Sequence, residues 1–215
     1  MTNAAVSRLH FPVTALGPGR RVGLWLQGCS IRCPGCISLD TWESDVGIVP
    51  LPDLIARVSA MAAEADGLTI SGGEPFDQPD VLSAVLGAWR SASRRSTLVF
   101  TGREFGEIAP WLADNDGLVD AVISGPFRSE QPQTVALRGS DNQELHVLTQ
   151  LGTEMNAFER TLQPEDRRLD VMFDELGHAW FAGIPARGDL GRLRRALSSA
   201  GHSTTTSDVV RNHAR

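Results

Sequence analysis

Short apolar runs alternate with amphipathic helical patterns through most of this chain, and the alternation limits the folds that it can adopt. The sequence predicts strands at six runs: residues 22–26, 68–71, 97–101, 119–123, 144–149 and 178–182. Helical patterns are expected at four places: residues 53–65, 79–89, 104–113 and 189–200. An alternation of strands with helices of this length favours right-handed βαβ units and a parallel sheet. We therefore expect an α/β fold, either a wound sheet or a partial, open parallel β/α barrel, because about six strands are too few to close an eight-stranded barrel.

The amino-acid composition excludes several kinds of catalytic chemistry. All 20 basic residues are arginine, so a Schiff-base lysine and a phosphate-loop lysine are excluded, and the absence of tyrosine excludes a tyrosine acid or base. The net charge of −6 lacks the basic bias of a nucleic-acid binder, so no nucleic-acid partner is expected. No apolar run approaches the length of a spanning helix, and the first nine residues do not resemble a secretory signal. We expect no membrane association.

The organisation of the chain is simple, with one domain expected at residues 11–200. The Ser/Thr/Arg-rich residues 201–215 are expected to form a flexible tail. There are only three cysteines, and all fall within residues 29–36. An odd, clustered set is a poor disulfide framework and favours a reducing compartment, so a cytoplasmic location is expected.

Glycines follow four of the predicted strands. They are Gly28, Gly72 with Gly73, Gly102 and Gly125. The carboxyl ends of parallel strands meet at one edge, where ligands bind in barrels and open α/β sheets. Glycine there allows a tight turn or a close approach of backbone to a ligand. The pattern predicts a single binding site along that edge.

Cys29, Cys33 and Cys36 follow the first of these strands with the spacing C-x3-C-x2-C. Thiolate ligands select zinc, copper(I) or an iron–sulfur cluster, and a structural zinc site needs four protein ligands. Three cysteines leave one coordination position open, which favours a reactive [4Fe-4S] cluster over a structural metal. Three other interpretations stay open: a thioredoxin-type dithiol at Cys33 and Cys36, a zinc site completed by His146 or His178, and buried inert thiols.

Ser71-Gly72-Gly73-Glu74-Pro75 stands at the next strand end. The two glycines expose bare backbone, and the Glu74 carboxylate would suit a bound ammonium group. Taken alone the motif is weak, since a tight turn with a helix-capping acid has the same sequence. Its position one strand after the cysteines strengthens it.

With these motifs in place, the sequence resembles the radical S-adenosylmethionine (SAM) superfamily, and more narrowly the activating enzyme of anaerobic (class III) ribonucleotide reductase. Six ordered segments carry the resemblance: Gly17-Pro18-Gly19-Arg20-Arg21, residues 28–36 with Thr41-Trp42, residues 68–75, Phe100-Thr101-Gly102, Ser124-Gly125-Pro126-Phe127, and residues 138–143. The resemblance covers residues 17–148 and implies an open parallel β/α barrel of the radical SAM type, with a cluster loop at residues 28–37. The chain departs from the family at three places. Ile37-Ser38 stands where the family commonly has an aromatic residue followed by Asn. Arg103 replaces an aromatic residue, and Ser124 replaces an Asp.

The resemblance also implies roles. Cys29, Cys33 and Cys36 would hold three irons of one [4Fe-4S] cluster, and SAM would chelate the fourth. Gly35, Cys36 and Ile37, together with Gly72, Gly73 and Glu74, would bind SAM. The expected reaction is reductive cleavage of SAM to a 5′-deoxyadenosyl radical.

That radical would then generate a glycyl radical on a partner reductase, with a flavodoxin- or ferredoxin-type protein as electron donor. The alternatives are a radical SAM enzyme of the same subgroup acting on another protein, a peptide or a small metabolite, and a non-enzymatic iron–sulfur or zinc module.

Overall fold

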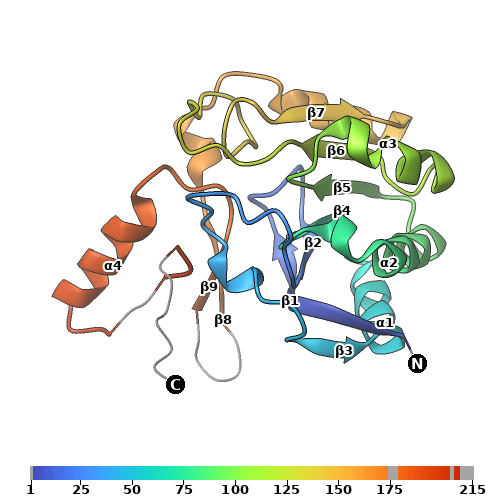
Figure 1. Ribbon diagram of the computed structural model, residues 1–215, viewed down its shortest axis with the longest axis horizontal. Helices are drawn as coiled ribbons and strands as arrows, with labels where there is room; N and C mark the ends of the chain where they lie inside the picture. Colours follow the sequence, from blue (N-terminus) through green and yellow to red (C-terminus); the bar gives the residue numbers. More distant parts are fainter. Residues whose placement is uncertain (1, 174–178, 204–205, 209–215) are drawn as a thin grey trace.

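A seven-stranded sheet forms the centre of the computed structural model, which describes residues 2–173, 179–203 and 206–208 (Figure 1). The strand order is β3-β1-β2-β4-β5-β6-β7. The four middle strands are parallel: β2 (Arg21–Leu26), β4 (Gly67–Gly72), β5 (Ser96–Phe100) and β6 (Ala121–Ser124). Antiparallel strands flank these four, with β1 (Asn3–Val13) and β3 (Ile48–Pro50) on one side and β7 (Glu144–Val147) on the other.

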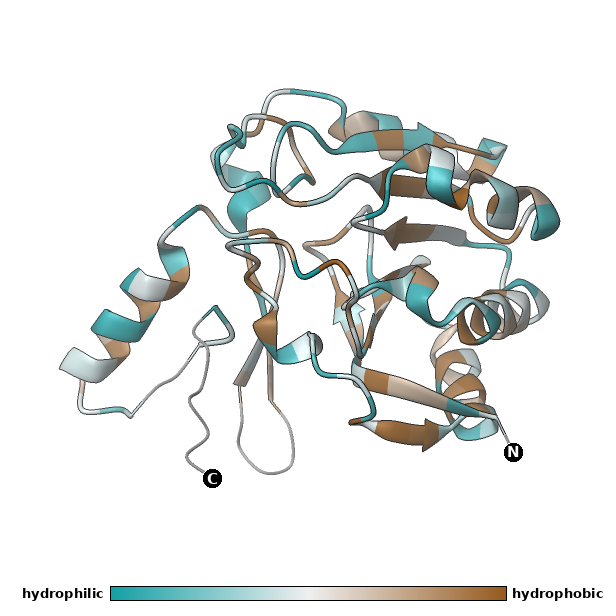
Figure 2. Cartoon of the chain, in the orientation of Figure 1, coloured by the Kyte–Doolittle hydropathy of each residue, from teal (hydrophilic) through white to brown (hydrophobic). Residues whose placement is uncertain are grey.

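Three helices cover one face of this sheet: α1 (Leu51–Met61), α2 (Pro79–Ala92) and α3 (Phe105–Asp114). Alternate residues of β2 point toward them, among them Leu24 and Leu26, and pack with α1 and α2 in the largest apolar core of the described residues. Figure 2 shows apolar residues concentrated on the central strands, in particular β5 and β6. The helices begin and end close to their predicted positions. Pro79 lies in the first turn of α2, where backbone N–H groups have no partner within the helix, so the missing N–H of proline costs no hydrogen bond.

The second face of the sheet is covered by the last third of the chain. Trp25 of β2 packs with Met172 and Ala182 of a separate antiparallel hairpin, β8 (Asp170–Phe173) and β9 (Ala179–Ala182). Leu98 and Ile123 pack with Met155 of a 3₁₀ segment, Gln150–Phe158. The helix α4 (Asp189–Ser199) then extends away from the sheet (Figure 1).

The expected sheet is correct in its centre and wrong at its edges. The predicted strand at 144–149 is β7, which runs antiparallel, and residues 179–182 pair with β8 and not with the main sheet. No closed barrel forms in the described part of the chain. The strands β1, β3 and β8 were not expected, because their mixed polar and apolar residues lack a clear alternation. His178 lies outside the described residues.

Ordered structure extends to both sides of the predicted domain, residues 11–200. The sheet begins at Asn3, ahead of residue 11. Most of the predicted flexible tail lies outside the described residues, but Ser207 contacts the main body of the protein. Its hydroxyl donates to the Ile37 carbonyl at 2.6 Å, and its own carbonyl accepts from the Leu39 N–H at 3.2 Å.

Arg21, the last residue of the Gly17-Pro18-Gly19-Arg20-Arg21 segment, has a structural role. Its guanidinium is fully buried and donates to Thr69 Oγ1 at 2.7 Å and to the Leu68 and Ser96 carbonyls at 2.8 and 3.1 Å. It thereby joins β2, β4 and β5. Burial lowers the pKa of Arg21 to about 10, still far above neutrality, so the side chain stays charged.

Among the helices that the structure describes, none combines the length and the apolar character needed to cross a membrane.

Candidate functional site

The carboxyl ends of β2, β4, β5 and β6 form one rim, as their glycines predict. Main-chain hydrogen bonds tie these ends together: the Gly73 N–H donates to the Leu26 carbonyl at 2.9 Å, and the Glu74 N–H donates to the Gly28 carbonyl at 2.9 Å. Farther along the rim, the Gly125 N–H donates to the Arg103 carbonyl at 2.8 Å. The turn after β4 therefore supports the base of the cysteine loop directly.

The end of β4 lies so close to the cysteine loop that residues 72 and 73 have to be glycine. Gly72 has a φ of +118°, which L side chains rarely adopt. A Cβ on Gly73 would fall far inside van der Waals contact with the Gly28 carbonyl oxygen and 2.9 Å from the Thr41 carbonyl oxygen. These two glycines thus bring the end of β4 against the loop that starts after β2.

Glu74 is a buried carboxylate at the centre of the rim, with an exposed fraction of 1%. Its Oε1 accepts from Thr101 Oγ1 at 2.7 Å and from the Phe76 N–H at 3.0 Å, and its Oε2 accepts from the Gly102 N–H at 2.9 Å. Burial raises the pKa of Glu74 above its ordinary value, and these hydrogen bonds oppose the rise. Three of about four acceptor sites on the carboxylate are already used.

Asp77, three residues after Glu74, is a site residue that the sequence analysis missed. It accepts from the Ser30 N–H at 2.7 Å and from Ser30 Oγ at 2.8 Å, and it pairs with Arg103 at 2.7 Å. Asp77 therefore anchors the residue that follows Cys29. Its position in the Glu74-Pro75-Phe76-Asp77 turn is the only sequence signal for this contact.

The three cysteine thiols are free and half-buried, and all lie on the loop after β2. Backbone N–H groups point at two of the sulfurs: Arg32 lies 3.5 Å from Cys29 Sγ, and Ser38 lies 3.4 Å from Cys36 Sγ. Burial raises the pKa of the Cys33 and Cys36 thiols. Hydrogen bonds from the Phe127 N–H to Cys33 and from the Ser38 N–H to Cys36 oppose this rise.

The loop fits an iron–sulfur cluster in its donor chemistry. It offers three thiols from a short segment, surrounded by N–H groups that stabilise thiolates, and a ligated thiol is deprotonated whatever its pKa as a free group. In the residues that the structure describes, no three His, Cys, Asp or Glu side chains are already gathered at the separations of a metal site.

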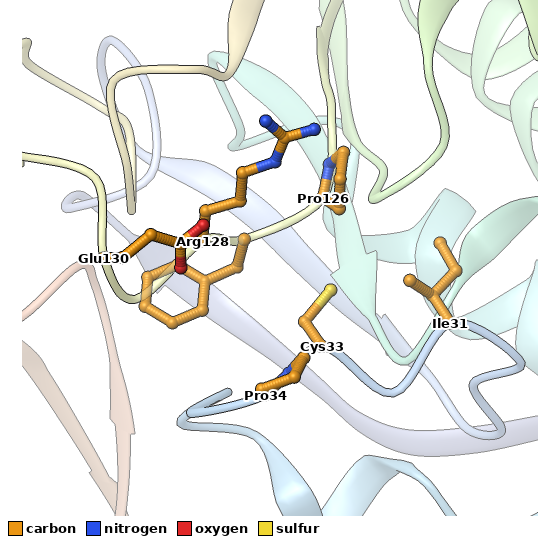
Figure 3. Close-up of a pocket in the computed structure, with 7 residues that line it drawn as sticks. Ile31, Cys33, Pro34, Pro126, Arg128 and Glu130 are labelled. Atoms are coloured by element: carbon orange, nitrogen blue, oxygen red, sulfur yellow. The ribbon is translucent and has the colours of Figure 1, made fainter.

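A hollow of about 270 Å³ lies beside Cys33. Its walls come from the cysteine loop and from the segment after β6, with Ile31, Pro126, Phe127, Arg128 and Glu130 among the lining residues. Figure 3 shows the Cys33 sulfur directed into this space, with Ile31 on one side and Pro126 on another. The rim thus offers room next to a candidate cluster ligand.

The remaining candidate SAM residues lie on the same loop. A Cβ on Gly35 would meet Ser129 Cβ at 3.1 Å, so this glycine packs against the segment after β6. Ile37 is 38% exposed, and its carbonyl is the acceptor for Ser207. Residues 35–37 thus lie on the cysteine loop, whose first residue, Gly28, contacts the turn at residues 72–74.

His146, a candidate zinc ligand, is engaged elsewhere. Its ring stacks on Phe105 with centroids 3.9 Å apart, and its Nε2 lies 3.0 Å from Ser124 Oγ. No described group of metal-ligating side chains includes it together with the cysteines.

The fold and the loop define a class: an α/β protein with a cysteine-rich site at the carboxyl end of its first parallel strand. A family model described as the 4Fe-4S single cluster domain matches residues 15–146. The chain belongs to this family, so an iron–sulfur cluster is the cofactor of the class. The match ends at β7, before the residues that cover the second face of the sheet.

Individual relatives point the same way. A protein of Salmonella typhi named anaerobic ribonucleoside-triphosphate reductase-activating protein is 28% identical over 65% of this chain and 96% of the relative. A protein of the same name from Enterobacteria phage T4 is 30% identical over 60% of this chain and 85% of the relative. The pyruvate formate-lyase-activating enzyme of Listeria monocytogenes is 30% identical over 51% of this chain and 46% of the relative. These matches confirm the resemblance to radical SAM activating enzymes that the sequence motifs indicate.

Proposed function

We propose that this chain is a radical SAM activating enzyme that generates a glycyl radical on an anaerobic ribonucleotide reductase. The observation that carries the proposal is the main-chain hydrogen bond from Glu74 to Gly28, which joins the Gly-Gly-Glu turn to the cysteine loop in a chain whose relatives bear the name of that activity. Cys29, Cys33 and Cys36 are the proposed ligands of a single [4Fe-4S] cluster. With only three cysteines, the chain has no further cysteines for a second cluster.

A cluster held by Cys29, Cys33 and Cys36 would supply the electron for reductive cleavage of SAM, and the resulting radical would remove a hydrogen atom from the substrate. The residues of the chain hold and orient these groups. The N–H groups of Arg32, Ser38 and Phe127 stabilise the thiolates, and Asp77 fixes the start of the loop through Ser30. The role of the protein is to position the reacting groups and to exclude water.

The proposed SAM site lies between residues 35–37 and residues 72–74 on the rim. Glu74 has about one acceptor site left for an ammonium group, since three protein donors already use the others. Its larger contribution is to hold Thr101 and Gly102, and so the end of β5, against the turn after β4. The backbone of Gly72 and Gly73 then forms the wall of the site beside the cysteine loop.

The exposure of the cysteine loop supports the proposed partner proteins. Arg32, Pro34 and Gly35 are exposed, so a protein substrate and an electron donor of the flavodoxin or ferredoxin type can approach the cluster closely. The hollow beside Cys33 offers a place for a substrate loop.

A glycyl-radical assay tests the proposal. The reconstituted protein is mixed anaerobically with SAM, a reductant and the anaerobic reductase encoded by the same genome, and the radical is recorded by electron paramagnetic resonance. We expect a glycyl radical signal with the wild-type protein and none with Cys33→Ala. SAM cleavage without a glycyl radical on the reductase would reject this substrate and favour another protein, a peptide or a small metabolite.

A further inference from the structure

The last of the six motif segments, residues 138–143, holds the chain that follows β6 outside the sheet. Asn142 donates from its amide Nδ2 to the Pro126 carbonyl at 2.8 Å. Gln143 donates from its amide Nε2 to the Gly125 carbonyl at 3.1 Å. Side chains thus take the place of a neighbouring strand as partners of this main chain.

A third contact comes from Ser140, which is fully buried. Its hydroxyl oxygen accepts from the Arg128 N–H at 3.1 Å. The Gln143 amide is fixed at both ends, because its Oε1 accepts from the Gly139 N–H at 2.8 Å. Together with the two amides, the Ser140 hydroxyl forms a clamp on residues 125–128.

Phe127 is the side chain that this clamp brings to the cysteine loop. A Cβ built on Gly139 would lie 3.2 Å from Phe127 Cδ2, and one built on Gly35 would lie 3.6 Å from Phe127 Cε1. These two atoms are on opposite corners of the ring, so the ring is wedged between the motif segment and the cysteine loop. Gly35 lies between Cys33 and Cys36, so the contact falls within the group of candidate ligands.

Phe127 also forms part of the wall of the hollow beside Cys33. Pro126 and Arg128, its two neighbours in the chain, line the same hollow (Figure 3). The three cysteines are only half-buried, so cover from a neighbouring segment matters for anything that they bind. The clamped segment supplies an apolar part of this cover.

We propose that the clamp is a positioning device for Phe127, whose ring shields the Cys33 side of the cluster from water. Ser140, Asn142 and Gln143 are then positioning residues, because they act on the cluster through Phe127. The physical reason is that the apolar shell around a metal site controls the access of solvent. The inference rests on the proposed ligation by the three cysteines, and it is independent of SAM and of the reductase.

The first test measures the rate at which the reconstituted holoprotein loses iron to a chelator in the absence of SAM. Phe127→Ala should lose iron about tenfold faster than the wild type, whereas Phe127→Leu keeps an apolar side chain and should stay closer to the wild type. A Phe127→Ala variant that holds its iron as long as the wild type would overturn the proposal. Failure of the wild type to take up iron would instead count against the proposed cluster itself.

Asn142→Asp tests the clamp, because it keeps the shape of the side chain and removes the donor to the Pro126 carbonyl. We expect iron loss about tenfold faster than in the wild type above neutral pH. The ratio of the two rates should fall toward one as the pH is lowered, since the introduced carboxyl group then regains a proton that it can donate.

Asp141→Asn is the matched control on the same segment. The Asp141 carboxylate accepts from the Thr134 N–H at 2.7 Å and from Thr134 Oγ1 at 2.6 Å, and not from residues 125–128. This variant should lose iron at nearly the wild-type rate. Equal acceleration in Asp141→Asn and Asn142→Asp, or a rate ratio for Asn142→Asp that ignores pH, would contradict the clamp.

Hydrogen exchange decides the matter if the variants hold no iron. Ser140→Ala removes the acceptor of the Arg128 N–H. In the protein without iron, we expect the amides of residues 127–128 and of residues 33–36 to exchange faster in Ser140→Ala than in the wild type, while those of β5 stay protected. Unchanged exchange at residues 33–36 would show that the clamp does not act on the cysteine loop.

Discussion

At the scale of single residues, the rim depends on two buried or half-buried carboxylates with different tasks. Glu74 gathers the ends of β4 and β5, and Asp77 fixes Ser30 beside the first cysteine. Neither carboxylate needs a bound cofactor to be satisfied. Protein donors alone therefore hold the ends of β4 and β5 and the start of the cysteine loop together.

Replacing Glu74 should cost stability as well as SAM affinity. Glu74→Ala leaves the Phe76 N–H, the Thr101 hydroxyl and the Gly102 N–H without their acceptor, at about 1–3 kcal/mol for each buried donor. We expect the free energy of unfolding, measured by urea denaturation, to fall by at least about 2 kcal/mol. We also expect a lower affinity for SAM, measured by equilibrium binding to the reconstituted protein. A stable variant with unchanged SAM affinity would show that Glu74 has neither role.

The raised pKa of Glu74 predicts a pH dependence of stability. The native state keeps this proton to a higher pH than the unfolded chain, so the stability associated with protonated Glu74 is complete below the ordinary pKa of 4.5. It is lost as the pH rises through the raised pKa. Glu74→Gln carries no titrating proton, so its free energy of unfolding should fall less between pH 4 and about pH 7 than that of the wild type. Parallel pH profiles for the two proteins would contradict the shift.

The sequence predicts the local parts of the site better than the contacts between distant segments. The spacing of Cys29, Cys33 and Cys36 places three thiols on one loop without knowledge of the fold. The contact of Asp77 with Ser30 joins residues far apart in the sequence, and so does that of Thr101 with Glu74. Such pairs depend on the register of parallel strands, which a single sequence does not specify.

At the scale of elements, the exit of β4 is shaped by close backbone packing. Gly73 lies where the end of β4, the cysteine loop and the Thr41 carbonyl meet. Gly73, which the sequence motif predicts to bind SAM, is therefore also required by the fold. Its two roles are separable only by measurement of stability and of cofactor binding in the same variant.

Gly73→Ala should push the cysteine loop away from β4. The added methyl group would overlap the Gly28 carbonyl, and overpacking of this kind costs about 1–3 kcal/mol. We expect lower stability in urea and lower iron content after reconstitution. The matched control is Gly87→Ala in α2, where no atom lies near the new methyl group and the helix gains about 0.5–1 kcal/mol. An unimpaired Gly73→Ala variant would show that this packing is not required.

The elements that were predicted well are those with a strong periodic pattern. The buried strands β2, β4, β5 and β6 appear as apolar runs, and α1 and α2 repeat their apolar residues at helical spacing. The strands β1 and β3 have no such pattern, because most of their residues are half-buried or exposed. The antiparallel direction of β7 is set by the segment after β6, whose path the sequence does not reveal.

At the scale of the whole molecule, the last third of the chain covers the second face of the sheet. The family match ends at residue 146, yet Trp25, Leu98 and Ile123 pack against residues that follow it. The Arg8 guanidinium also lies 4.4 Å from the centre of the Trp180 ring, which links β1 to β9. We expect the hairpin and the sheet to unfold together.

Met172→Ala tests this coupling. Met172 is 4% exposed and packs against the sheet through Trp25, so its loss should cost about 2–5 kcal/mol in a single cooperative transition. Val171→Ala, at a neighbouring residue that is 50% exposed, should change stability by less than about 0.5 kcal/mol. Two separate transitions, or an unchanged midpoint for Met172→Ala, would show that the hairpin folds independently of the sheet.

The most direct test of the central claim is the metal content and SAM chemistry of the protein reconstituted without oxygen. We expect about four irons per chain and, after addition of a reductant, formation of 5′-deoxyadenosine from SAM. Cys29→Ala, Cys33→Ala and Cys36→Ala should each abolish both results. Uptake of zinc without iron, or a complete cluster that leaves SAM intact under reducing conditions, would contradict a cluster with one position open to SAM.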